Sequence, residues 1–172
     1  MLDQKILEEL QEYLEANLAL IIEEEFILYS PSEKSIDSDS VMESVSPLDI
    51  EMFINNKRQP TLQEVLFDFI DKKEATDAEV YKKAGLDRRL FSKIRSSQKY
   101  RPGKNTVLAL ALALELNKTE TDRLLGSAGY SLSDSDTTDL IIQFFIEKEI
   151  YSIREVNYAL DHFSMKPLSG VL

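Results

Sequence analysis

The chain has 172 residues, of which 43% are hydrophobic, enough for one compact domain or a small domain with an appended segment. It has no cysteine, which excludes disulfide bonds, thiolate metal sites and a cysteine nucleophile. A formal net charge of −11 argues at first against a nucleic-acid partner, because an evenly acidic surface repels phosphate. No apolar run is long enough to cross a bilayer and the acidic start is unlike a signal peptide, so we expect a cytoplasmic protein with no membrane partner.

The first 29 residues are predicted to form an amphipathic acidic helix that runs from about residue 3 to residue 26 or slightly beyond. Its leucines and one isoleucine recur at three- and four-residue steps, at Leu7, Leu10, Leu14, Leu18 and Ile21. Such a stripe must pack either on the body of the protein or on a second copy. The helix is therefore a candidate dimer surface and a candidate binding site for a protein partner.

Residues 30–47 are rich in serine and acidic side chains and predict a flexible acidic linker. After it, Ser or Thr followed three residues later by an acid indicates helix starts by the capping-box pattern. The pattern occurs at Ser46–Asp49, Thr61–Glu64, Thr76–Glu79, Thr119–Asp122 and Ser152–Glu155. We predict a lead-in helix near 48–56 and further helices near 62–72, 77–84, 88–96, 104–116, 120–127, 137–149 and 153–163.

The charge is distributed unevenly along the chain. Residues 72–104 hold 11 basic against 4 acidic side chains, a net of +7, whereas residues 1–71 carry −13 and residues 105–172 carry −5. A basic island of this kind inside an acidic chain is typical of a polyanion site, although solvated helix faces are the alternative interpretation.

A turn within the basic island carries the functional pattern. Gly85 stands where one short helix must stop and reverse, Leu86 is placed to fill the corner, and Asp87 can cap the next helix. That helix turns Leu90, Phe91 and Ile94 inward. Its outward face holds Arg88, Arg89, Ser92, Lys93 and Ser96. A short helix with outward arginines at its start, after a glycine-containing turn, has the geometry of a recognition helix.

Residues 61–117 resemble the Cro/repressor-type (XRE) helix-turn-helix family. The matching positions are Gly85, Leu86 and Asp87 in the turn, then Phe91, Ser92 and Ile94, then Pro102 and the pair Thr106-Val107. The resemblance implies an all-α, lambda-repressor-like five-helix domain over residues 48–130, lead-in helix included. We expect the N-terminal amphipathic helix beside it and a C-terminal helical extension, residues 131–172, packed on it.

The resemblance also implies a sequence-specific regulator of the repressor type that binds double-stranded DNA, as a homodimer, with helix 88–96 in the major groove. The positions that read bases in the family fall on Arg88, Arg89 and Lys93, and Ser92 shares their face. The loop that contacts the phosphate backbone falls on Lys99, Tyr100, Arg101 and Lys104.

Two features leave alternatives open at this site. Tyr81 stands where the family has a small alanine, so its ring either splays the two helices or tips outward. Arg88 and Arg89 either face DNA or pair with Asp77, Glu79 or the acidic N-terminal segment as surface ion pairs.

Two other functions fit the same sequence. The chain could be a protein-interaction module that keeps the fold, with the acidic N-terminal arm as a partner-binding element. Alternatively, that arm could fold over the basic island and inhibit it. The C-terminal helices 137–163 are either core or dimer surface. We expect no catalytic residue, cofactor or metal, and His162, the single histidine, is interpreted as a surface residue rather than a ligand.

Overall fold

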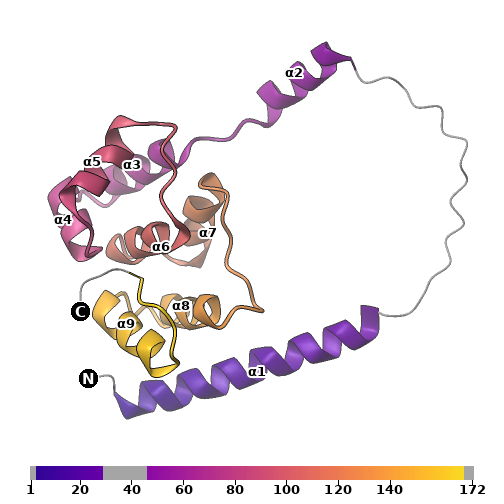
Figure 1. Cartoon of the computed structure of the whole chain (residues 1–172), viewed down its shortest axis with the longest axis vertical. Helices are drawn as coiled ribbons and strands as arrows, with labels where there is room; N and C mark the ends of the chain where they lie inside the picture. Colours follow the sequence, from indigo (N-terminus) through magenta and orange to yellow (C-terminus); the bar gives the residue numbers. More distant parts are fainter. Residues whose placement is uncertain (1–2, 29–45, 169–172) are drawn as a thin grey trace, which may run out of the picture.

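The structure, a computed structural model, describes residues 3–28 and 46–168, and of the first helix beyond Asn17 only the backbone. These residues are helical and contain no strand, which confirms the all-α prediction. The helices run in the order α1 (Gln4–Leu28), α2 (Pro47–Lys57), α3 (Leu62–Lys72), α4 (Asp77–Lys83), α5 (Arg88–Ser96), α6 (Lys104–Ala113), α7 (Lys118–Ser127), α8 (Thr137–Glu147) and α9 (Ile153–His162) (Figure 1). Apart from Ser46 and Pro47, which begin α2, the predicted linker 30–47 lies outside the described residues.

Helix starts follow the capping chemistry that the sequence predicts, with one correction. Ser46, Thr61 and Thr76 each form a complete capping box at the start of α2, α3 and α4. Ser152 caps α9 by accepting from the backbone of Glu155. The predicted box at Thr119 is wrong, because α7 begins two residues earlier, with Asn117 as N-cap and Glu120 as its reciprocal partner.

Helix ends follow a second pattern, in which a residue with positive φ stops the helix and an apolar residue follows it. Gly85 and Gly129 take this conformation after α4 and α7, at φ 63° and 72°. Glu74, Glu115 and Glu149 take it after α3, α6 and α8, at φ 51°, 53° and 56°. Helices α6 and α8 consequently end at Ala113 and Glu147, two or three residues before the predicted ends.

Helix α6 lies at the centre of the core. Every residue from Val107 to Ala113 is buried, which confirms the prediction of a central buried helix. Helices α4, α7 and α9 pack against α6, α3 packs against α7, and α8 packs against α7 and α9. The buried side chains from Leu10 to Leu168 form one continuous cluster. The predicted C-terminal extension therefore shares its core with the domain before it.

The amphipathic helix α1 packs on the body of the protein. Leu10 is fully buried and Leu14 nearly so, and the ring of Tyr13 meets that of Phe144 of α8 edge-on at 5.4 Å. Lys148 Nζ lies 2.5 Å from Glu9 Oε2, and Gln143 donates to the Tyr13 hydroxyl. In the part of the stripe whose side chains are described, Leu10 and Leu14 thus find their partner within the chain, as one of the two expectations had it. Helix α8 buries its own apolar side chains in the core.

Helix α2 differs from every other described helix because it buries none of its residues. Its large apolar side chains are exposed, with Leu48 and Phe53 the most so, at 63% each. Figure 1 shows it set apart from the body, at the end of the segment that leads into α3. No described helix is long and apolar enough to cross a membrane.

Candidate nucleic-acid interface

The turn between α4 and α5 has the geometry that the sequence predicts. Gly85, in the left-handed region, reverses the chain, and the backbone N–H of Leu86 donates to the carbonyl of Tyr81 at 2.8 Å. The Leu86 side chain is half-buried against the core. Asp87 is the N-cap of α5, and its carboxylate accepts from the backbone of Arg89 at 2.6 Å. The turn therefore fixes the direction in which α5 begins.

The inner face of α5 is anchored by aromatic packing. Phe91 and Ile94 are buried, whereas Leu90, expected on the same stripe, is only half-buried. The Phe91 ring lies 6.2 Å from that of Phe67 of α3 and 5.9 Å from that of Tyr81 of α4. Tyr81 therefore does not tip away into solvent: its ring is half-buried and packs beside Phe91 where α4 and α5 meet.

Arg95 ties the end of α5 to the start of α4. Its guanidinium holds the Asp77 carboxylate through two nitrogens, at 2.6 Å and 2.7 Å, and lies over the Phe67 ring at 4.2 Å. The hydrogen bond from Arg95 to Asp77 raises the pKa of the guanidinium above its ordinary value. Sequence reasoning missed this role, because Asp77 and Arg95 are 18 residues apart and their pairing depends on the crossing of α4 and α5.

The outer face of α5 presents a set of exposed polar and cationic side chains, Arg88, Arg89, Ser92 and Lys93. Among the residues that the structure describes, Arg88 and Arg89 take part in none of the ion pairs. The two acids named as alternative partners are occupied, Asp77 by Arg95 and Glu79 by the capping box with Thr76. Within the described residues both guanidinium groups are therefore exposed and without an ion-pair partner; the third alternative, the acidic N-terminal segment, lies in part outside these residues.

The loop from Ser97 to Gly103 follows α5 and contains the remaining predicted contacts. Lys93 Nζ lies 4.3 Å from the centre of the Tyr100 ring, which is half-buried, and Lys99 is exposed. Arg101 and Lys104 have partners inside the protein instead. Arg101 stacks on Tyr130, and Lys104 Nζ lies 2.5 Å from Asp139 Oδ2. The structure thus groups the cations of α5 and places Tyr100 beside Lys93. Arg101, although exposed, contacts the α7–α8 connection, and Lys104 contacts α8.

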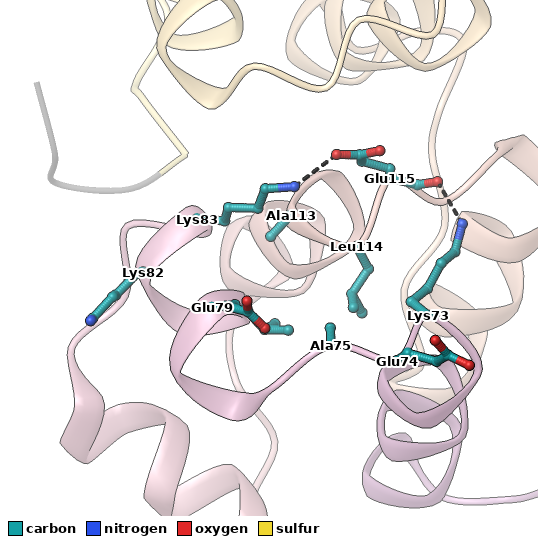
Figure 2. A pocket seen from close by; sticks show the side chains of 10 residues that line it. Lys73, Glu74, Ala75, Glu79, Lys82, Lys83, Ala113, Leu114 and Glu115 are labelled. Atoms are coloured by element: carbon teal, nitrogen blue, oxygen red, sulfur yellow. Dashed lines mark hydrogen bonds and ion pairs between the residues drawn. The ribbon is translucent and has the colours of Figure 1, made fainter.

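A separate hollow lies where the turn between α3 and α4 faces the end of α6 (Figure 2). Two lysines on its rim bind Glu115, the left-handed residue after α6: Lys83 Nζ donates to its carboxylate at 2.7 Å and Lys73 Nζ to its carbonyl at 3.2 Å. The hydrogen bond from Lys83 lowers the pKa of Glu115 below its ordinary value. These cations complete the end of a helix, where positive charge is favourable, and they do not belong to the outer face of α5.

The acidic arm lies away from this surface as far as it is described. Helix α1 runs along α8, and Figure 1 shows α1 and α5 on opposite sides of the molecule. His162 is exposed at the end of α9 beside Phe163, and the described residues contain no group of three or more potential metal ligands.

The described residues thus define an all-α protein whose helices α4 and α5 are joined by a glycine-containing turn and whose α5 has an apolar inner face and a cationic outer face. Comparison of the chain with models of protein families, with curated proteins and with solved structures finds no match. The resemblance to the XRE family therefore rests on the residues of the turn and of α5, on Pro102 and on the pair Thr106-Val107.

Proposed function

We propose that the protein is a cytoplasmic, sequence-specific DNA-binding regulator of the repressor type that inserts α5 into the major groove. The observation that carries the proposal is the exposed face of Arg88, Arg89, Ser92 and Lys93, in which neither arginine has an ion-pair partner among the described residues. An arginine fork matches guanine O6 and N7, and each such pair discriminates against a wrong base by about 1–3 kcal/mol.

The loop and the symmetry of the assembly complete the proposal. In this proposal the exposed Lys99 contacts phosphate and adds affinity that falls with salt. A homodimer would present two copies of α5 to half-sites about 34 Å apart. The proposal assigns no catalytic chemistry, cofactor or metal to the chain.

The test is selection of bound fragments from genomic DNA with wild type and an Arg88→Ala/Arg89→Ala/Lys93→Ala variant. We expect wild type to enrich defined sequences at low salt and the variant to lose that enrichment. The matched control, Lys118→Ala/Arg154→Ala/Lys166→Ala, removes three exposed cations from other parts of the surface and should keep the enriched sequences. Equal and negligible retention of DNA by wild type and the α5 variant contradicts the proposal.

A second candidate function, binding of a protein partner, is favoured by α2, whose Leu48 and Phe53 are 63% exposed. Because Leu10 and Leu14 of α1 are buried and α1 packs on α8, the described side chains offer α2 rather than α1 as the apolar contact. A Leu48→Ser/Phe53→Ser variant tests this by sedimentation. An unchanged mass of the particle in the variant removes α2 as a surface for self-association.

A further inference from the structure

The loop between α5 and α6 is held by the connection between α7 and α8. Two residues of the loop carry the attachment, Arg101 and Pro102, and two residues that follow α7 receive it, Gly129 and Tyr130. They are 28 residues apart in the sequence, so the attachment exists only in the folded protein.

Three contacts join these four residues. The Arg101 guanidinium lies 4.4 Å from the centre of the Tyr130 ring and donates to the Gly129 carbonyl at 3.0 Å. The Tyr130 hydroxyl donates in return to the Pro102 carbonyl at 3.1 Å. We refer to Arg101, Pro102, Gly129 and Tyr130 as the loop clamp.

Gly129 is fitted to this arrangement in two ways. Its φ of 72° is a backbone conformation that favours glycine. A Cβ atom at this position would also lie 2.9 Å from Nη2 of Arg101, so a side chain here would require the guanidinium to shift. Gly126, three residues earlier, has open space around its Cβ position, so the close approach is specific to the residue under the guanidinium.

A second tie lies just past the loop. Lys104, at the start of α6, pairs with Asp139 of α8, whose carboxylate is 5% exposed and also accepts from the backbone of Ser133 at 2.8 Å. The Asp139 carboxylate thus binds α6 and the α7–α8 connection together. Both cations at the exit of the loop therefore have partners within the protein, although Arg101 remains exposed. Lys99 before them is exposed and has no ion-pair partner among the described residues.

We propose that Arg101 and Lys104 are positioning residues rather than phosphate contacts, and that through the loop clamp the α7–α8 connection sets the conformation of the DNA-contacting loop. The expected effect on DNA binding rests on the proposed function, whereas the loop clamp itself does not. Charge reaches the phosphates from α5 and Lys99, and the segment after α7 holds Lys99 and Tyr100 in place.

Hydrogen exchange of the free protein tests the clamp without DNA. In Tyr130→Leu we expect the backbone amides of residues 98–101 to exchange about tenfold faster, and in Tyr130→Phe, which loses only the hydroxyl, about threefold faster. Tyr158→Leu, at an exposed tyrosine on α9, is the matched control and should leave these amides unchanged. Thermal unfolding checks that each variant is folded. If Tyr130→Leu is unfolded, Tyr130→Phe still tests the clamp. Unchanged exchange in folded Tyr130 variants overturns the clamp.

The salt dependence of DNA binding then separates positioning from contact. Each phosphate contact contributes about 0.9 to the slope of log affinity against log salt. We expect Lys99→Gln to lower that slope by about this amount, and Arg101→Gln to weaken binding about threefold to tenfold with the slope unchanged. A slope reduced by Arg101→Gln as much as by Lys99→Gln overturns the assignment of Arg101. If wild type binds no DNA, the proposed function fails, while the exchange experiment still decides the clamp.

Discussion

Helices α5 and α8 have similar lengths, nine and eleven residues, but they are specified in opposite ways. In α8 every residue from Asp139 to Ile146 is buried, so packing dictates its composition. In α5 only Phe91 and Ile94 are buried, and the capping by Asp87 and the Arg95–Asp77 pair hold the rest of the helix in place. The outer side chains of α5 are therefore not needed for core packing, which leaves them available for recognition.

The largest loss of stability is expected in α8. Phe145 is fully buried, and a Phe145→Ala variant should lose about 3–5 kcal/mol of the free energy of unfolding, because the lost burial is compounded by an unfilled cavity. Chemical denaturation measures the loss. A loss below about 1 kcal/mol would show that α8 does not depend on close packing.

A smaller loss is expected where α8 meets α6. Asp139→Ala leaves Lys104 without its partner and the Ser133 N–H without its acceptor, and should cost about 2 kcal/mol. The matched variant Asp134→Ala removes an exposed acid of the connection that precedes α8 and should be nearly neutral. Equal effects of the two substitutions in chemical denaturation would contradict the structural role of Asp139.

A gain in stability is expected from a substitution just after the end of α8. Glu149 has a φ of 56°, a conformation that costs a residue with a Cβ atom about 1 kcal/mol. Glycine avoids this strain but loses more chain entropy on folding. We therefore expect Glu149→Gly to raise the free energy of unfolding by about 0.5 kcal/mol. Glu149→Ala keeps the Cβ atom and should show no such gain. A stabilisation shared by both variants would have to come from the lost charge.

Acid should weaken the capping that places α4 before the turn. Hydrogen bonds from the backbone and hydroxyl of Thr76 lower the pKa of Glu79 below its ordinary 4.5. Its contribution is therefore complete above pH 4.5 and disappears as the pH falls through the lowered value. We expect Glu79→Gln to have a lower Tm than wild type at pH 7, and the difference to shrink as the pH falls below 4.5. A constant difference across this range would exclude the charged cap as its cause.

The smallest effect on stability is expected on the outer face of α5. Arg88→Ala/Arg89→Ala should change the free energy of unfolding by less than about 0.5 kcal/mol, because both side chains are exposed without ion-pair partners among the described residues. Chemical denaturation measures this beside the Phe145→Ala variant. A loss above 1 kcal/mol would mean that the arginines support the fold, which removes the contrast between α5 and α8.

Much of the fold could be predicted because its helices begin at N-cap residues that a short stretch of sequence reveals. Ser46, Thr61, Thr76 and Asp87 each cap a helix through atoms within three residues. The start of α7 was mistaken because Asn117 and Thr119 are both followed three residues later by an acid, and local pattern cannot rank them. The early ends of α6 and α8 carry no glycine as a signal, since Glu115 and Glu149 take the left-handed conformation instead.

In the candidate site, too, the local features could be predicted and the long-range contacts could not. The order of Gly85, Asp87 and the cations of α5 is local, so their placement could be predicted from spacing. The partners of Arg95, Arg101 and Lys104 lie 18, 28 and 35 residues away, and nothing in the sequence pairs them. A cation in a basic loop looks the same in sequence whether it faces phosphate or a tyrosine ring.

The contact between α1 and α8 has a consequence for the order in which the protein can assemble. The hydrogen bond from Gln143 to Tyr13 spans 130 residues, and Leu10 and Leu14 have their packing partners across the same interval. During synthesis the ribosome delivers the amino end first, so α1 must wait, with its leucines uncovered, until α8 has emerged. Helix α1 is thus made before its partner and can dock only after α8 has been synthesised.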